Sequence, residues 1–255
     1  MTTILKIGGS VLTDKNKVSA ARPDVIARIA KEIGEIDSGK LVLIHGAGSF
    51  GHHQAKDYKL TDGLNDWSIK GIWPTHSAVT SLNRMVVDAL QMSGVDAIPV
   101  NPLSSCTLSG GRIEHMCLDV IELMLQDDIT PVLHGDVVMD RDRGVDILSG
   151  DQIVPYLARE LKVDRVGIGT NVDGVLDRDG KLIRKLTPGN MGEVDKILSG
   201  SGGVDVTGGM HGKIHELMPL AKVGIPSLVF NAEKPGNVMK FLKNDLQEGT
   251  FIRGD

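Results

Sequence analysis

The chain has 255 residues, of which 41% are hydrophobic, 24% charged and 3% aromatic, and its formal net charge is −5. The scarcity of aromatic residues argues against a stacking platform for single-stranded nucleic acid, and the negative charge argues against a general nucleic-acid surface. No apolar run is long enough to cross a membrane. We therefore expect a globular protein whose partners are small molecules, with neither nucleic acid nor a membrane among them.

The amino-terminal residues lead directly into an apolar strand without a charged-then-apolar leader, so we expect no signal peptide. Cys106 and Cys117 match neither a disulfide framework nor a zinc-binding spacing. Two free, buried thiols are typical of a reducing compartment. We therefore expect the protein to be cytoplasmic.

Short apolar runs predict the strands of the fold. In chain order they cover residues 4–7, 41–44, 97–100, 130–133, 165–169, 227–230 and 250–252. Several of these runs are continuously apolar, which is typical of strands that a parallel sheet buries on both faces. Residues 200–203 form a glycine-rich loop that is too short to separate two domains.

Apolar residues at helical spacing predict four helices between those strands. The first begins at Pro23 and carries Val25, Ile26, Ile29, Ile33 and Ile36; the second carries Val79, Leu82, Met85, Val86 and Leu90; the third carries Val120, Leu123 and Met124; the fourth carries Ile153, Leu157 and Leu161. Strands that alternate with helices imply an α/β fold with a mainly parallel sheet. We expect residues 1–255 to form one domain, with a soft boundary near Gly150 between two lobes.

A lysine and two glycines lie at the end of the first predicted strand. Lys6 belongs to the apolar run 4–7, and residues 8–10 follow with the sequence Gly-Gly-Ser. A lysine in a strand can reach solvent from the edge of a sheet. Glycines, however, let the backbone approach a phosphate closely, so we expect the Lys6 ammonium to point at phosphate oxygens. Lys15, in the following loop, either reaches the same region or is an ordinary solvated lysine.

A second glycine-rich loop follows the second predicted strand. Residues 46–51, Gly-Ala-Gly-Ser-Phe-Gly, formally match the G-x-G-x-x-G fingerprint of dinucleotide binding. The polar residues after it show no apolar stripe, and no strand with an acidic end follows at the required distance, so we favour a phosphate-binding loop. His52 directly follows the loop and can donate to the same anion. His53 is the alternative donor, and no third ligand at metal-binding spacing accompanies the two histidines.

Further residues suited to ligand binding lie in the second half of the chain. Asp151 precedes a predicted helix, where it either caps that helix or orients lysines at the edge of a phosphate site, and the two roles are compatible. Asp173 is typical of a turn, with a ribose or base contact as the functional alternative. Gly208 and Gly209 allow a close approach, and Lys213 would direct another cation at nucleotide phosphates. Ligands of such sheets bind beyond the carboxyl ends of the strands.

Together these segments resemble the amino acid kinase family over nearly the whole chain. Residues 6–10, the second glycine loop, residues 169–174 (Gly-Thr-Asn-Val-Asp-Gly) and residues 207–213 (Thr-Gly-Gly-Met-x-x-Lys) appear in the family's order. Each piece alone is weak, but the combination is specific. Within the family, residues 48–52 are most similar to isopentenyl phosphate kinases, and fosfomycin kinases are near relatives. Ala47 departs from the glycine expected there; it keeps the backbone N–H but narrows the allowed conformations.

The resemblance implies a three-layer α/β sandwich with a mainly parallel central sheet. It also implies residues that bind ATP: Lys6, Ile7, Gly8, Gly9, Ser10, Gly48, Thr170, Asp173, Gly174, Gly208, Gly209 and Lys213. It implies residues that hold the phosphate of the second substrate: Ala47, His52, Gly150 and Asp151. The implied catalytic residues are Lys6, Lys15, His52 and Lys213, with Lys15 as the transition-state stabiliser. The substrate side is then the lobe of about 1–150, the nucleotide side is the lobe of about 151–255, and the assembly is a homodimer.

The reaction that the resemblance implies is ATP-dependent phosphorylation of isopentenyl phosphate to isopentenyl diphosphate, in an alternative mevalonate route of isoprenoid biosynthesis. A monophosphate acceptor brings its own anionic nucleophile, so the site needs cations and amides rather than a strong base. Mg²⁺ is expected to arrive with ATP. Two alternatives remain: a kinase of another small phosphate or phosphonate such as fosfomycin, and a nucleotide-sensing module that does not turn ATP over.

An isopentenyl tail is apolar and needs a small apolar wall beside the phosphate site. The best candidates by their position in the sequence are Val79, Leu82, Val86, Val137 and Ile147. For each of them, an ordinary place in the core is the alternative.

Overall fold

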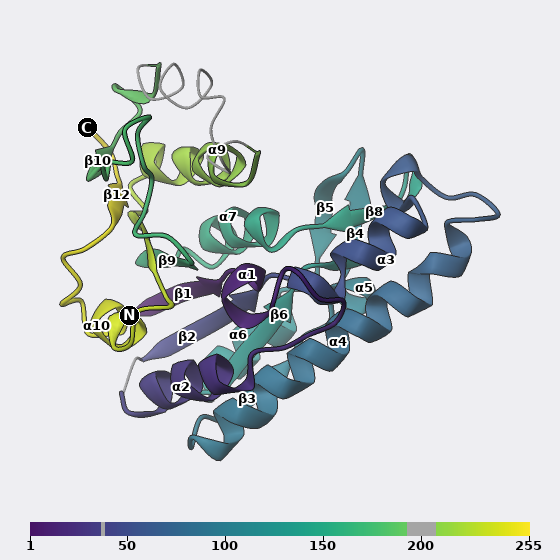
Figure 1. Cartoon of the computed structure of the whole chain (residues 1–255), viewed down its shortest axis with the longest axis horizontal. Helices are drawn as coiled ribbons and strands as arrows, with labels where there is room; N and C mark the ends of the chain where they lie inside the picture. Colours follow the sequence, from purple (N-terminus) through teal and green to yellow (C-terminus); the bar gives the residue numbers. More distant parts are fainter. Residues whose placement is uncertain (37–38, 193–207) are drawn as a thin grey trace.

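The computed structural model describes residues 1–36, 39–192 and 208–255. These residues form an eight-stranded sheet with the strand order β10-β12-β11-β9-β1-β2-β6-β3 (Figure 1). Its strands are β1 (Thr2–Ile7), β2 (Lys40–His45), β3 (Ala97–Pro99), β6 (Thr130–His134), β9 (Arg165–Thr170), β10 (Lys185–Leu186), β11 (Ser227–Asn231) and β12 (Thr250–Ile252). Neighbouring strands are parallel except β11 and β12. The seven predicted strands and the mainly parallel sheet are confirmed.

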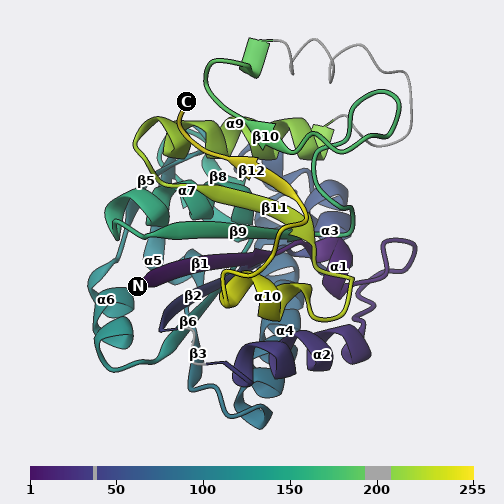
Figure 2. The same cartoon turned by 90° about the vertical axis from the view of Figure 1, so that its left-hand side faces the viewer.

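Helices cover both faces of this sheet (Figure 1, Figure 2). One layer contains α1 (Gly9–Leu12), α2 (Pro23–Gly34), α4 (Ile69–Met92) and α10 (Asn237–Leu242), and the other contains α6 (Asp119–Gln126), α7 (Gly150–Glu160) and α9 (Gly208–Lys222). Ile4 and Leu5 are neighbours in β1 but pack into opposite cores, because successive side chains of a strand point to opposite faces. The predicted three-layer sandwich is confirmed.

The helices differ in how well their apolar spacing predicts the buried face. In α2, Pro23 occupies the first turn and the buried positions include the predicted ones at 25, 26, 29 and 33. In α6 the predicted face is wrong at two of its three positions, because Val120 and Leu123 are exposed. Met124 is partly buried against the core, and the fully buried residues are Ile121 and Leu125. This eight-residue helix carries apolar residues around most of its circumference, so spacing alone does not select one face.

A second sheet of order β5-β4-β7-β8 lies beyond one end of the main sheet (Figure 1) and was not expected from the sequence. Its strands are β4 (Cys106–Ser109), β5 (Arg112–Met116), β7 (Asp136–Asp140) and β8 (Gly144–Leu148). Against it lie α3 (His52–Asp57), α5 (Pro102–Ser105) and the 3₁₀ helix η2 (Leu60–Asp62), while a second 3₁₀ helix, η1 (Gly48–Phe50), lies in the second glycine loop. Cys106 is buried, but Cys117 is exposed, so the expectation of two buried thiols is wrong for Cys117.

Candidate active site

The two glycine-rich loops are in direct contact at the carboxyl ends of β1 and β2. These strands are parallel neighbours, and Ile7 is paired with His45. A Cβ atom on Gly46 would lie 2.5 Å from the backbone nitrogen of Gly9, and a Cβ atom on Gly9 would collide with Gly48. The close approach of two backbones therefore requires glycine at both Gly9 and Gly46.

The segment between α1 and α2 is fastened to the second glycine loop. The Ser49 N–H donates to Thr13 Oγ1 at 3.0 Å, and the Ser19 N–H donates to the Ser49 carbonyl at 3.1 Å. Thr13 also forms a bridge with Ala21, which closes the segment at its base. Lys15 lies on the exposed turn of this segment, so it sits on a loop that is anchored beside the candidate phosphate site.

Two lysines meet at one carboxylate between the lobes. Lys6 forms an ion pair with Asp151, and Lys213 Nζ lies 3.2 Å from the other oxygen of that carboxylate. Lys6 is only 3% exposed, and β1 lies between β2 and β9. The alternative of a solvated lysine on an edge strand is therefore excluded. Gly150 makes room for the lysine, because a Cβ atom there would lie 3.3 Å from Lys6 Cε.

The electrostatics of this cluster favour binding of an anion. Burial lowers the pKa of Lys6, the charge of Lys213 lowers it further, and Asp151 opposes both effects. Burial acts to raise the pKa of Asp151, but Lys6 and Lys213 outweigh burial and hold it below its usual value. Two cations that share one carboxylate leave positive charge for phosphate oxygens, in a region where desolvation strengthens the attraction.

Asp151 does not cap α7. The N-cap is Ser149, whose Oγ accepts the N–H of Gln152 at 3.3 Å. The carboxylate of Asp151 is thereby available to the two lysines, and the amino-terminal end of α7 faces the same cluster, with its dipole favourable to anions. Of the two roles considered for Asp151 from the sequence, the capping role is wrong.

His52 is the first residue of α3 and lies at the exit of the second glycine loop. Burial lowers the pKa of His52, and the charges of His53 and Lys213 lower it further. Because the charge of Lys213 acts on His52, the end of this loop lies near the lysine cluster, although the two residues are far apart in the chain. Both His52 and His53 are exposed by surface area, but the His52 ring is surrounded closely enough by protein for partial desolvation to shift its pKa.

The predicted nucleotide-side residues follow β9 and begin α9. Ser10 Oγ lies 3.3 Å from Asn171 Oδ1, and the Gly8 N–H donates to the Gly169 carbonyl at 2.8 Å, so this turn borders the first glycine loop. In α9, Lys213 Nζ donates to the Gly209 carbonyl at 3.1 Å. Thr207 and the loop 200–203 lie outside the described residues.

Asp173 forms an ion pair and a hydrogen bond with two residues that were not predicted from the sequence. Lys234 Nζ lies 2.8 Å from Asp173 Oδ1, and Asn231 Nδ2 donates to the same oxygen at 2.9 Å. The hydrogen bonds from Lys234 and Asn231 lower the pKa of Asp173. Gly174 has a φ of +149° and its hypothetical Cβ would press against Thr250, so both backbone conformation and packing require glycine there.

The candidate tail-wall residues fall into two groups. Val79 lies against the second glycine loop, because a Cβ atom on Gly51 would be 2.9 Å from Val79 Cγ1. Val137 and Ile147 pack with Leu60 and Val145 beneath α3 and α4. We call these four residues the small cluster. Leu82 and Val86 instead pack in the core between α2, α4 and the sheet. Their burial in this core agrees with the alternative of an ordinary place in the core.

A buried carboxylate beside the small cluster was missed from the sequence. His76 Nδ1 lies 2.9 Å from Asp136 Oδ2, and burial raises the pKa of Asp136. The two residues are 60 positions apart on α4 and β7. No local sequence signal pairs them. Among the residues that the structure describes, no group of three histidine, cysteine or acidic side chains could hold a metal ion, and no helix could span a membrane.

Comparisons with known proteins show the family to which the chain belongs. The model of the amino acid kinase family matches residues 1–231, and the chain belongs to that family. The chain is similar to the isopentenyl phosphate kinase of Methanocaldococcus jannaschii, with 40% identity over 99% of this chain and 98% of the relative. It is also similar to that of Methanothermobacter thermautotrophicus, with 38% identity over 98% of both chains. A solved isopentenyl phosphate kinase structure superposes with a TM-score of 0.87 at 35% identity, over 99% of this chain and 100% of the other.

Proposed function

We propose that the chain transfers the γ-phosphoryl group of ATP to isopentenyl phosphate and produces ADP and isopentenyl diphosphate. The observation that carries this proposal is the pair of lysines, Lys6 and Lys213, joined through Asp151 where two glycine loops meet. Similarity to isopentenyl phosphate kinases over almost the full length of both chains supports it. The alternatives are a kinase of another small phosphate or phosphonate such as fosfomycin, and a nucleotide-sensing module that does not turn ATP over.

Transfer of a phosphoryl group needs positioning and charge neutralisation more than covalent chemistry. In this proposal Lys6, Lys213 and the backbone amides of Gly8, Gly9, Ser10 and Gly48 bind the phosphates of ATP. Ala47, His52 and the start of α7 at Gly150 and Asp151 hold the acceptor phosphate. Lys15 reaches from its anchored loop to the transferring group and stabilises its charge. An oxygen of the acceptor phosphate attacks in line, and no protein base is required.

The nucleotide is proposed to lie over the carboxy-terminal lobe of about 151–255, against Ile7, Thr170, Asp173 and Gly174 and the start of α9 at Gly208 and Gly209. The amino-terminal lobe of about 1–150 then carries the acceptor. We propose that Mg²⁺ is carried by the ATP phosphates, since this ion keeps several waters and prefers phosphate oxygens. Bound there, it would neutralise charge on the phosphates.

The finer biological setting is also a proposal. Free thiols at Cys106 and Cys117 fit a reducing compartment, so we place the protein in the cytoplasm. A homodimer is proposed from the resemblance to the family. Isopentenyl diphosphate as product places the chain in isoprenoid biosynthesis.

Direct detection of the product tests the function. Purified protein with MgATP and isopentenyl phosphate should convert the single ³¹P resonance of the acceptor into the two coupled resonances of a diphosphate, while ADP accumulates in step. ATP binding without any ADP formation would contradict the proposal and favour a nucleotide-sensing module.

A further inference from the structure

Two buried histidines end neighbouring strands and contact the glycine that follows each of them. His45 ends β2, His134 ends β6, and the two residues are partners in the sheet register. Their rings stack with centroids 5.6 Å apart. His45 Nδ1 lies 3.1 Å from the Gly46 carbonyl oxygen, and His134 Nδ1 lies 3.1 Å from the Gly135 carbonyl oxygen. The first of these glycines, Gly46, begins the second glycine loop.

The hydrogen bonds of His45 determine which nitrogen carries its proton. Burial lowers the pKa of His45 to about 4, so the ring is neutral at neutral pH. A carbonyl oxygen only accepts hydrogen bonds, and the proton is therefore on Nδ1. Nε2 then accepts from Asn83 Nδ2 at 3.0 Å. Asn83 Nδ2 also lies 3.4 Å from the Val132 carbonyl, so two acceptors face this nitrogen and fix the orientation of the amide.

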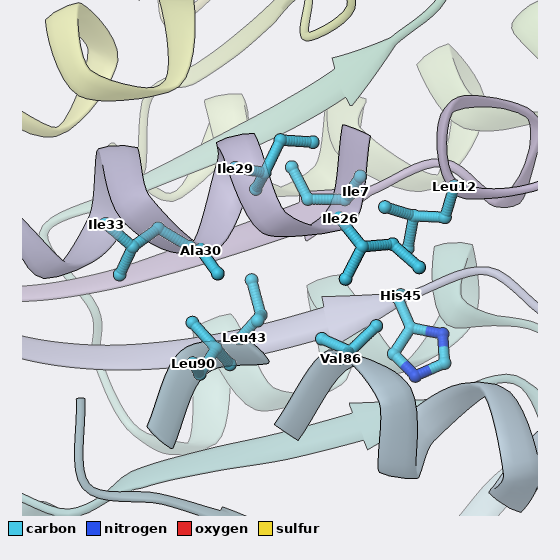
Figure 3. Close-up of a pocket in the computed structure, with 10 residues that line it drawn as sticks. All are labelled: Ile7, Leu12, Ile26, Ile29, Ala30, Ile33, Leu43, His45, Val86 and Leu90. Carbon is cyan, nitrogen blue, oxygen red and sulfur yellow. The ribbon is translucent and has the colours of Figure 1, made fainter. Parts of the chain in front are cut away.

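The surroundings of the His45 ring are mostly apolar. The ring lies at the carboxyl end of β2 beside Leu12 and Val86, where the lining of a small pocket between α2, β2 and α4 is otherwise apolar (Figure 3). A buried polar ring in such surroundings is tolerated only when its nitrogens are hydrogen-bonded. The Gly46 carbonyl and the Asn83 amide supply these two hydrogen bonds to the His45 ring.

Holding the Gly46 carbonyl also orients the next N–H group. In a planar trans peptide the carbonyl of residue 46 and the N–H of residue 47 point in opposite directions. With the carbonyl turned toward the buried His45 ring, the Ala47 N–H points away from the core. Among the residues that the structure describes, no protein acceptor receives this N–H. Gly46 packs against Gly9 and its N–H donates to the Ile7 carbonyl at 3.0 Å, and the hydrogen bond from His45 adds a constraint on its carbonyl side.

We propose that His45 is a positioning residue whose Nδ1–H holds the Gly46 carbonyl and thereby keeps the Ala47 N–H aimed at the acceptor phosphate. The inference rests on the proposed role of Ala47 in binding that phosphate. His45 itself touches no substrate. Its loss weakens binding of the acceptor more than binding of ATP, because Gly48 is the only residue of the second glycine loop that the proposed function assigns to ATP, and the other ATP contacts come from the first glycine loop, the turn after β9 and α9.

Two substitutions separate the donor from the ring. His45→Asn places an amide nitrogen close to the position of Nδ1 and keeps the donor, but it loses the ring. His45→Phe keeps the ring and loses the donor. We expect His45→Phe to raise the KM for isopentenyl phosphate roughly 10- to 100-fold, the range for one lost buried hydrogen bond, with a much smaller rise in the KM for ATP. His45→Asn should stay close to the original protein.

His134→Phe is the matched control. It replaces a buried imidazole of the same kind and removes the same contact to a following glycine, but Gly135 does not belong to the second glycine loop. We expect the KM of both substrates to be unchanged. If His45→Asn is impaired and His45→Phe has normal kinetics, packing of the ring matters instead of the donor. If His134→Phe raises the KM for the acceptor as much as His45→Phe does, the effect is a general loss of order. Either result overturns the proposal.

A second measurement needs no variant and no turnover. Long-range ¹H–¹⁵N spectra of the full chain at neutral pH report the tautomer of each histidine ring. We expect the proton of His45 on Nδ1, and a proton on Nε2 overturns the proposal even where a substituted protein fails to fold. If the original protein does not phosphorylate isopentenyl phosphate, the proposed function fails, while the tautomer still decides whether His45 holds the Gly46 carbonyl.

Discussion

At the scale of single residues, the sequence indicated which side chains carry charge but not which partners they meet. Lys6 and Lys213 were singled out because each accompanies glycines in a loop. Their common partner, Asp151, had an equally good explanation as a helix cap until the structure assigned that role to Ser149. His45 drew no attention within its apolar run, since its partner Asn83 is 38 positions away. Contacts between distant positions leave no local pattern.

His52 gives the sharpest prediction at this scale. Its pKa is lowered by burial and by the charges of His53 and Lys213, so a bound phosphate should raise it again. His52→Ala should cost roughly 2–4 kcal/mol of transition-state stabilisation, the range for loss of one preorganised donor to developing charge. His53→Ala, the matched control, should cost much less. The measurement is kcat/KM for the acceptor, and equal losses in two folded variants would contradict the assignment.

At the scale of elements, strands were predictable where burial on both faces makes them continuously apolar. The strands of the second sheet lack that signal. In β5 and β8, polar and charged residues interrupt short apolar stretches, and the hairpin between β7 and β8 turns through charged residues and Gly144, which has a φ of +79°. Most residues of β7 and β8 are buried, but Asp136, Asp140 and Asp146 are among them, so these strands lack a continuous apolar run.

The second sheet matters for function because it supplies part of the proposed tail wall. Val79 of α4 lies against the glycine loop, and Ile147 of β8 belongs to the small cluster. Shortening both side chains removes several methyl groups, each worth about 0.8 kcal/mol of burial, and makes room for a longer chain. The Val79→Ala/Ile147→Ala double variant should therefore gain specificity for geranyl phosphate over isopentenyl phosphate.

The measured quantity is the ratio of kcat/KM for the two acceptors. Leu82→Ala provides the comparison, because Leu82 is fully buried in the core between α2, α4 and the sheet. It should lower stability without changing that ratio. An unchanged ratio in a folded, active double variant would place the tail pocket elsewhere.

At the scale of the whole molecule, one continuous sheet joins the two halves of the chain. The pairing of β1 with β9 puts the first glycine loop beside the turn at Asn171, and α7 and α9 bring Asp151 and Lys213 to the same edge. The alternation of strands and helices predicted this class of fold. The resemblance to the family predicted which loops meet. The geometry of the site depends on strand pairs and side-chain contacts between distant positions, for which the sequence has no local pattern.

The buried histidine pair gives a prediction about stability. Burial lowers the pKa of both His45 and His134 to about 4. Between pH 7 and pH 5 the unfolded chain gains protons on these rings while the folded chain does not, so the free energy of unfolding decreases as pH falls. The decrease should be roughly 2 kcal/mol per histidine by pH 5 for an ordinary pKa near 6.5 in the unfolded chain.

Denaturant unfolding at the two pH values measures this change. His134→Phe removes one of the two titrating rings and should flatten the dependence by about half. A free energy of unfolding that is the same at pH 7 and pH 5, or that rises at pH 5, would contradict the neutral state assigned to the pair.

The central claim is that this chain phosphorylates a prenyl monophosphate. A coupled assay of ADP release with MgATP and a panel of acceptors tests it most directly, with isopentenyl phosphate, dimethylallyl phosphate, fosfomycin and N-acetylglutamate compared by kcat/KM. We predict the highest value for isopentenyl phosphate and turnover of dimethylallyl phosphate, whose tail has the same number of carbons. Absence of turnover with both prenyl phosphates, together with clear turnover of fosfomycin or the amino-acid acceptor, would contradict the account.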